Sequence, residues 1–533
     1  MFSLLHSVEI ALLLVLTCIL YVAIIKFTQD DEQTRKLLQA FPVVGLRNEL
    51  LASFRATLRS LTKTGEWASE GYVKFAKSNS PYLISTIDRG LILMLPPKQM
   101  KTVYKLPEGR LDVFGTLQEQ IKAQWTIRDD RIIRDPFHRY LLPRQLTRDL
   151  HRQTEPMVEE MVAAFEHSWG SCTDWKDINI WQSCFSIIAR TVNTAYCGAP
   201  MCRNERYLKA LEGQSLALFG GSTLIGIAPR PLKPVVGFFV RQWCNYYSRT
   251  INTICSPLIQ DRIEATTRAG SDFQSNTGVL KDGLQLIVEE SIARNDPSLL
   301  STRLISDRLT ITNNLTLHGV TFTVHHLLLA LACSDPKYAY AATLREECRA
   351  VFQAAGQKWT LESLRRLRLL DSALRESMRF IPFSTVAMAR TVVDPGGISL
   401  QNGQSKVIIP VGTTLAVPIE CIHYDENIFP GAHKFDPFRF VKQGDSGSES
   451  DYTTIKPTTS PDDQFFGFGT STNPCPGRFL AVHSIKLIMA HALLNYEWKH
   501  IDSKLALSNI LAMKVPNQQT SLQVRRCSRQ RDS

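Results

Sequence analysis

The chain has 533 residues, and 44% of them are hydrophobic, which is enough for one large enzyme domain with a sizeable core. Lysine and arginine outnumber aspartate and glutamate by 61 to 50, so a membrane surface or an acidic protein is favoured as a partner. No basic block is interleaved with aromatic residues, and no cysteine or histidine group has zinc spacing, so the sequence predicts neither a nucleic-acid-binding protein nor a zinc protein.

A mostly apolar run from Leu4 to Ile25 opens the chain and is long enough to span a hydrocarbon core of about 30 Å. Lys26 and two further basic residues follow, which places the rest of the chain in the cytosol. No cleavage site follows the run, so an anchor is favoured over a signal peptide. We expect an anchor over residues 1–26 and a polar linker over 27–40. The twelve cysteines, mostly in apolar contexts, agree with a reducing compartment.

The rest of the chain predicts a mainly α fold with a small β portion. Helical periodicity extends over 148–169, 315–333 and 361–381. Short extended stretches with turn residues between them lie from Val386 to Val417. The polar, Ser/Thr-rich segment 442–463 predicts a surface excursion.

Cys475 stands between two prolines in "FFGFGTSTNPCPGRFLA", residues 465–481, just before an apolar helical run. A helix N-terminus and free backbone N–H groups stabilise a thiolate, and small residues let the backbone fold close to the sulfur. A lone thiolate cannot hold zinc or an iron–sulfur cluster, but it can be the single axial ligand of a haem. A buried structural cysteine remains the alternative from this stretch alone.

Three charged residues form a second pattern. "RESMR" places Glu376 and Arg379 on one face of a helix, where the two side chains can bond. Further along, "HYDENIFPGAHKFDPFRF" at 423–440 carries Arg439. We expect Arg439 to join Glu376 and Arg379 in a buried charge triad with a structural role.

The order and spacing of these motifs resemble the cytochrome P-450 superfamily, most closely fungal members that tailor secondary metabolites. The shared pattern is a Glu-x-x-Arg helix, a Pro-x-Arg-Phe segment and a Phe-x-x-Gly-x-x-x-Cys-x-Gly loop. The resemblance implies a haem domain over 41–524, followed by a basic tail over 525–533. It makes Cys475 the iron ligand, and it makes Phe468 and Gly477 the motif phenylalanine and glycine. It also implies that Arg390 pairs with a haem propionate.

The cysteine loop departs from the family pattern at two positions. Ser471 stands where the family has glycine, and Thr472 stands where it usually has a basic residue. The second change removes one propionate partner, so haem anchoring must rest on other groups.

The central helical run departs further. An ungapped alignment puts Thr316 at the family's small-residue position, His318 at the acid and Gly319 at the threonine that assists proton delivery. If another hydroxyl replaces that threonine, helix geometry favours Thr316 or Thr323, both within roughly 60° of Gly319, over Thr321 on the far side.

Two other features have weaker implications. His325 and His326 are expected to be helix-packing or surface residues. The stretch 218–234, "LFGGSTLIGIAPRPLKP", resembles the substrate-gating region of the family.

The resemblance implies an endoplasmic-reticulum protein with one transmembrane helix and a cytosolic domain. It would insert oxygen from O2 into a small apolar molecule, with electrons from NADPH through a flavin-containing reductase. Two rivals remain: a haem-thiolate isomerase or dehydratase, and a haem-binding membrane protein without turnover. The sequence does not identify the substrate.

Overall fold

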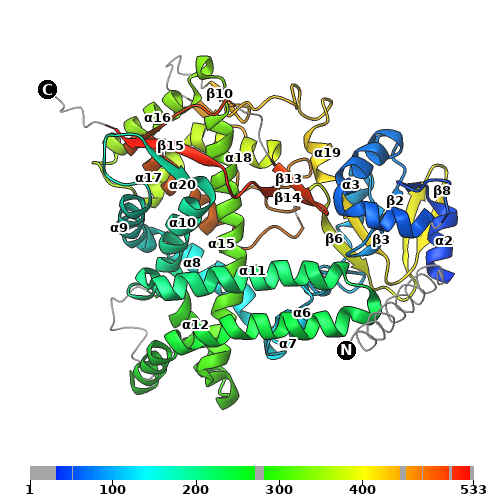
Figure 1. The fold of residues 1–533 in the computed structure, drawn as a ribbon, viewed down its shortest axis with the longest axis horizontal. Helices are drawn as coiled ribbons and strands as arrows, with labels where there is room; N and C mark the ends of the chain where they lie inside the picture. The colour runs from blue at the N-terminus through cyan, green and yellow to red at the C-terminus, as the bar shows by residue number, and fades with distance from the viewer. Residues whose placement is uncertain are drawn as a thin grey trace, which may run out of the picture.

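The computed structural model describes residues 32–50, 52–269, 281–443, 452–470, 472–502 and 507–527. Over these residues the chain is mainly helical with a small β portion, as the sequence predicts (Figure 1). The predicted anchor and Ser471 lie outside the described residues. Residues 32–40 of the predicted linker form a helix that buries Leu37. The first residues of the predicted tail continue a strand in which Arg525 pairs with Glu497.

The helices form the larger part of the molecule. Their bounds are α2 Glu32–Ala40, α3 Ala52–Lys74, α4 Pro97–Val103, α5 Phe114–Gln120, α6 Ala123–Thr126, α7 Arg131–Arg134, α8 Phe137–Arg148, α9 Leu150–Ser168, α10 Ile180–Cys197, α11 Glu205–Ile227, α12 Lys233–Ala269, α14 Gly283–Ala293, α15 Thr302–Ala332, α16 Tyr340–Ala354, α17 Leu361–Arg366, α18 Arg368–Phe380, α19 Ile419–His423 and α20 Arg478–Asn495.

The strands form a mixed six-stranded sheet in the order β1-β2-β3-β9-β6-β4, a three-stranded sheet β12-β15-β5 and three two-stranded pairs. Their bounds are β1 Val43–Val44, β2 Tyr82–Thr86, β3 Gly90–Met94, β4 Leu111–Asp112, β5 Lys176–Asn179, β6 Ala387–Val392, β7 Ile398–Asn402, β8 Ser405–Ile409, β9 Thr414–Val417, β10 Val441–Gln443, β11 Tyr452–Thr454, β12 Tyr496–Trp498, β13 Leu507–Ile510, β14 Met513–Pro516 and β15 Ser521–Arg526.

Helix α15 is the central element. It runs through the middle of the molecule, with the six-stranded sheet on one side and α9, α10 and α20 on the other (Figure 1). Of the helices in the described residues, it is the one long and apolar enough to cross a membrane, but 72% of its most apolar window is buried inside the protein. An apolar helix enclosed in this way is a core helix.

The predicted helical run 361–381 is two helices, because the chain turns at Leu367. Thr360 begins α17 with a capping box in which its side chain and that of Ser363 each accept the other's backbone N–H. The carboxylate of Glu347 accepts the N–H groups of Leu369 and Leu370, at 2.7 and 3.0 Å, and so satisfies the first turn of α18.

The prediction of a surface excursion holds for most described residues of 442–463, which are exposed or half-buried, but not for Thr458 and its contacts. Thr458 is fully buried, and its hydroxyl and backbone N–H bond to Asp371. Asp462 accepts a hydrogen bond from the buried Arg375 at 2.8 Å. Two polar residues of this stretch therefore bond to buried partners on α18, while most of the others face solvent at least in part.

Buried histidines make the stability of the fold dependent on pH. Burial lowers the pKa of six of them to about 3 or about 4: His138, His318, His325, His423, His483 and His491. The unfolded chain binds these protons near pH 6.5, whereas the folded chain excludes them until the pH is near 4.

The free energy of unfolding is therefore expected to fall as the pH drops from about 7 to about 5, because the unfolded state then binds more protons. The thermal midpoint, followed by circular dichroism, measures this. His491→Phe is the matched control, since it keeps ring packing against Phe165, 4.8 Å away, and removes one titrating group. The variant should show a shallower fall. A midpoint independent of pH would contradict the account.

Candidate active site

The loop before α20 holds Cys475 by backbone bonds. The Cys475 N–H donates to the Phe468 carbonyl oxygen at 2.7 Å, and Gly469 and Pro474 form an antiparallel bridge. Gly469 has φ of +92°, and a Cβ there would lie 2.7 Å from the Asn473 carbonyl oxygen. Only glycine fits this turn, which folds the chain back onto the cysteine.

The Cys475 side chain is exposed and lines a large cavity. Burial raises the pKa of the thiol, while the N–H groups of Gly477 and Arg478 and the charge of Arg478 act in the opposite direction. Helix α20 begins at Arg478, so its N-terminus is directed at the sulfur. These donors favour a thiolate as soon as a cation binds it.

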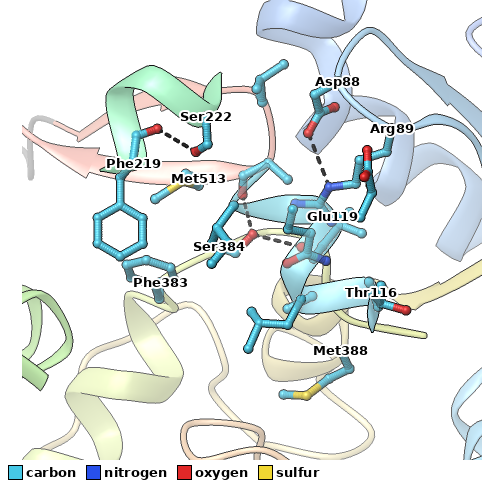
Figure 2. Close-up of a pocket in the computed structure, with 18 of the residues that line it drawn as sticks. Asp88, Arg89, Thr116, Glu119, Phe219, Ser222, Phe383, Ser384, Met388 and Met513 are labelled. Atoms are coloured by element: carbon cyan, nitrogen blue, oxygen red, sulfur yellow. Dashed lines mark hydrogen bonds and ion pairs between the residues drawn. The ribbon is translucent and has the colours of Figure 1, made fainter. Parts of the chain in front are cut away.

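The cavity has a volume of about 1630 Å³, which exceeds the roughly 300–1,000 Å³ of an ordinary ligand pocket. Figure 2 shows Phe219, Phe383 and Met513 gathered at one side of it and the Asp88–Arg89 ion pair at another. Part of the 218–234 stretch, from the end of α11 to the start of α12, forms another wall. The space can hold a large planar cofactor on Cys475 together with a small apolar molecule.

Helix α15 presents Thr316, His318, Gly319 and Thr323 to the cavity, whereas Thr321 is fully buried on another side. The helix is regular from Thr302 to Ala332, which is the condition under which the sequence argument holds. Gly319 has no atom within 4 Å of where a Cβ would lie, so the position is open.

The histidines of α15 are uncharged at neutral pH. Burial lowers the pKa of His318 to about 4, and its ring packs edge-on against Phe219 at 4.8 Å. His318 therefore cannot supply the charge of the family's acid. His325 and His326 are both buried packing residues, and His326 also lines the cavity.

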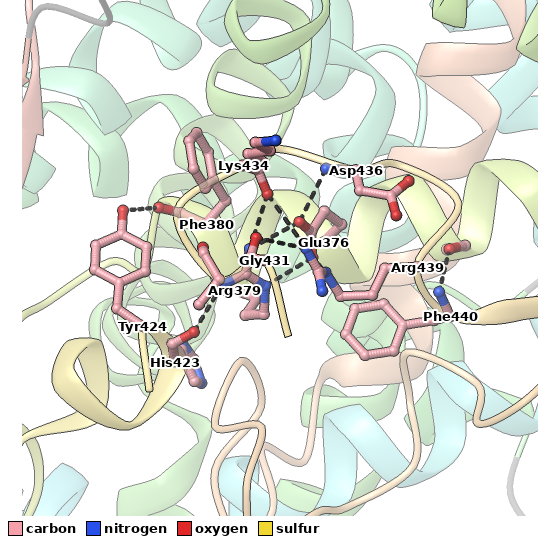
Figure 3. A network of polar contacts seen from close by, with 12 residues as sticks. Glu376, Arg379, Phe380, His423, Tyr424, Gly431, Lys434, Asp436, Arg439 and Phe440 are labelled. Atoms are coloured by element: carbon pink, nitrogen blue, oxygen red, sulfur yellow. Dashed lines mark hydrogen bonds and ion pairs between the residues drawn. The ribbon is translucent and has the colours of Figure 1, made fainter. Parts of the chain in front are cut away.

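The structure brings Glu376, Arg379 and Arg439 together in one network of polar contacts (Figure 3). Arg379 donates to both Glu376 oxygens at 2.7 and 2.8 Å, and Arg439 Nε donates to Glu376 at 3.1 Å. Glu376 and Arg379 have no exposed side-chain surface, and Arg439 has 13%. The Asp436 N–H completes the carboxylate's partners at 3.1 Å. None of the three side chains is among the residues that line the cavity, which agrees with a structural role.

His423 connects this cluster to the cysteine loop, a link that the sequence analysis missed. Its carbonyl oxygen accepts from Arg379 at 2.6 Å, and its ring Nε2 lies 3.1 Å from the Phe466 N–H. The ring stacks between Phe465 and Phe466, each 5.8 Å away. Burial, with a smaller contribution from Arg379, lowers its pKa to about 3, so the ring is neutral and its Nε2 accepts. A histidine in "IECIHYD", flanked by apolar residues, was the available signal.

Arg390 lies beside the cavity and touches the cysteine loop. Its guanidinium donates to the Tyr104 carbonyl oxygen at 2.9 Å and lies 3.4 Å from the hydroxyls of Thr470 and Thr472. Thr472 thus contacts the arginine instead of supplying a second cation. Arg139, on α8, lines the cavity and makes no ion pair among the described residues. The sequence analysis overlooked Arg139.

The donor set fits one haem. A single thiol faces a large apolar cavity, and within the described ranges no group of three or more His, Cys, Asp or Glu residues could hold a metal ion. Several arginines stand at or beside the cavity, among them Arg139 and Arg230 in its lining and Arg390 beside the cysteine loop, and haem carries two carboxylates that such cations can pair with. The fold and the site therefore define a haem-thiolate protein.

Comparison with known proteins identifies the family. The family model for cytochrome P-450 matches residues 98–523. The chain is 35% identical over 506 residues to cytochrome P-450 monooxygenase okaG of Penicillium ochrochloron, covering 91% of this chain and 94% of the relative. It is 28% identical over 491 residues to monooxygenase gloP of Glarea lozoyensis, covering 90% of each, and 30% identical over 465 residues to monooxygenase htyF of Aspergillus rugulosus, covering 86% and 68%. The chain belongs to the cytochrome P-450 family of monooxygenases.

Removing Arg379 should prevent the fold from holding haem. Loss of one partner of a buried ion pair costs roughly 3–5 kcal/mol, out of a typical stability of about 5–15 kcal/mol. We expect Arg379→Ala to yield little haem-loaded protein, measured as Soret absorbance per unit of protein. Arg368→Ala, at the exposed start of α18, is the surface control. Normal haem content with lost turnover would instead assign Arg379 a direct catalytic role.

Proposed function

We propose that this protein inserts one oxygen atom from O2 into a small apolar molecule as a tailoring step of fungal secondary metabolism, with a terpenoid or polyketide as substrate. The observation that carries the proposal is the apolar cavity of about 1630 Å³ that opens onto the Cys475 thiol. The named relatives are fungal monooxygenases, which supports the same class of reaction.

Haem, held by the Cys475 thiolate, would supply the chemistry of O2 reduction, since an axial thiolate favours O–O cleavage. Gly477 and Arg478 would donate N–H groups to the sulfur and moderate its charge. Arg390 and Arg139 would pair with the haem carboxylates. Burial lowers the pKa of Arg390, which a carboxylate partner would offset.

The remaining residues would orient the substrate and manage protons. The reaction R–H + O2 + 2 electrons + 2 protons gives R–OH and water, so two protons must reach the cavity. Apolar side chains such as Phe219, Phe322 and Phe383 would hold the substrate and exclude water. The cavity-facing hydroxyls of α15, Thr316 and Thr323, would take the place of the hydroxyl absent at Gly319.

The partners are part of the proposal. An anchor over residues 1–26 would hold the enzyme in the endoplasmic reticulum membrane as a single-pass protein with its catalytic domain in the cytosol. NADPH would supply electrons through a flavin-containing reductase, and the net charge of +11 suits an acidic partner.

Microsomes from yeast expressing the full chain with a fungal reductase, fed a panel of terpene and polyketide scaffolds, test the function. A product heavier by one oxygen atom, formed with matching consumption of NADPH and O2, supports it. A product of unchanged oxidation state, formed without NADPH, would identify an isomerase or dehydratase instead. Haem-loaded protein that is inert with every scaffold would favour a haem-binding protein without turnover.

Cys475→Ala should abolish the thiolate-type absorption shift that appears when carbon monoxide binds the reduced protein, because no other described thiol lines the cavity. Difference spectra of wild-type and variant microsomes measure the shift. Cys421→Ala, a thiol outside the cavity, is the matched control and should retain it. Persistence of the shift in Cys475→Ala would disprove the ligand assignment.

A further inference from the structure

Two hydroxyls meet at the cavity wall where α10 crosses α15. The Tyr196 hydroxyl oxygen lies 2.7 Å from Thr316 Oγ1, and both residues line the cavity. Thr316 Oγ1 is also 3.2 Å from the Thr312 carbonyl oxygen, which can only accept. Either hydroxyl can donate across the 2.7 Å contact; when Thr316 gives its proton to the Thr312 carbonyl oxygen, Tyr196 is the donor between the two hydroxyls.

A second polar contact fixes the relative position of the two helices. One turn before the hydroxyl pair, Asn313 on α15 donates to Asn193 on α10 at 2.6 Å, and both amides are fully buried. A buried amide pair must keep its geometry, because an unpaired amide in this position is costly. Tyr196 and Thr316 are consequently held in register.

The pair shares its cavity with the cysteine, since Tyr196, Thr316 and Cys475 all line it. Burial raises the pKa of Tyr196 to about 12, against the opposing effect of the contact with Thr316. The phenol therefore stays protonated at neutral pH and is available as a donor. Only 3% of Tyr196 is exposed, so bulk water does not compete for its proton.

Thr323, the other candidate on α15, lacks such a partner. Its hydroxyl donates to the Gly319 carbonyl oxygen of the preceding turn at 2.8 Å, and no second side chain contacts it among the described residues. Thr316 alone combines a cavity position with a neighbouring proton donor.

We propose that Thr316 delivers protons to the reacting oxygen and that Tyr196 is a positioning residue that feeds and orients the Thr316 hydroxyl, in place of the hydroxyl missing at Gly319. This inference rests on the proposed monooxygenase function.

The protons of this step come from solvent and pass through the two hydroxyls. The Thr316 O–H turns from the Thr312 carbonyl towards the substrate side and gives its proton to the oxygen being reduced. The Tyr196 O–H bond breaks as its proton passes to Thr316 Oγ1, and the phenolate regains a proton that bulk solvent supplies through water at the cavity mouth. The relay runs twice in each turnover, which delivers the two protons of the overall reaction. Electrons come from NADPH, as in the overall reaction.

The first measurement uses carbon monoxide as the probe. Its stretching frequency in the reduced, haem-loaded protein responds to hydrogen-bond donors nearby. We expect Tyr196→Phe and Thr316→Val to shift this frequency in the same direction at normal haem content, and Thr321→Val to leave it unchanged. Thr321 is the matched control, because it lies on α15 but outside the cavity.

The second measurement is peroxide released per NADPH oxidised, with farnesol as an apolar probe. General acid catalysis is worth roughly 10²–10⁴-fold, so Tyr196→Phe should lower product per NADPH by about tenfold or more and raise peroxide correspondingly. Gly319→Thr in the Tyr196→Phe background should restore coupling, since the position is open and takes a side chain. Gly319→Val, of the same shape without the hydroxyl, should not.

Each outcome has one meaning. Wild-type coupling and an unshifted frequency in Tyr196→Phe would overturn the proposal, as would uncoupling confined to Thr323→Val or rescue by Gly319→Val. If wild type forms no oxygenated product from any scaffold, the proposed function fails. The carbon monoxide measurement would still decide whether the hydroxyl pair reaches the ligand.

Discussion

The structure depends on the Glu376 carboxylate, which lies out of contact with solvent and is neutralised by two guanidinium groups. Desolvation destabilises such a buried cluster unless every N–H donor has an acceptor. Here Arg379 and Arg439 donate further N–H groups to carbonyl oxygens of the segment before the cysteine loop. That segment is thereby fixed against α18. His423, whose carbonyl and ring bond in opposite directions, carries the constraint to Phe466 and so to the loop of Cys475.

The cavity differs from the charge cluster, because several of the groups in its wall are not engaged in strong polar contacts. The thiol of Cys475 faces open space, Gly319 leaves a gap on α15, and neutral His318 offers no charge. A family member that has lost its usual hydroxyl must obtain protons from elsewhere. The proposed Tyr196–Thr316 pair would meet that need, with Tyr196 reaching Thr316 from the neighbouring helix α10, and would explain why the change at residue 319 can be tolerated.

Local sequence patterns predicted the elements whose contacts are near in sequence. The periodicity over 148–169 and 315–333 corresponds to α9 and α15, and the turn residues between Val386 and Val417 separate β6 to β9. Contacts distant in sequence had no such signal. Nothing in the sequence near Tyr196 predicts its contact with Thr316. Nothing in the polar stretch around Thr458 predicts that Thr458 is buried and bonded to Asp371. The triad of Glu376, Arg379 and Arg439 was an exception, because the two family motifs that contain these residues predicted their contact although it is distant in sequence.

If the charge cluster and the cysteine loop form one energetic unit joined by His423, their substitutions cannot act independently. A double-mutant cycle with Arg439→Gln and His423→Leu, read as the free energy of unfolding of the haem-loaded protein, measures the coupling. Residues in one network typically couple by about 0.5–3 kcal/mol, and we expect a value in that range. Additivity within about 0.3 kcal/mol would mean that the cluster does not hold the loop of Cys475.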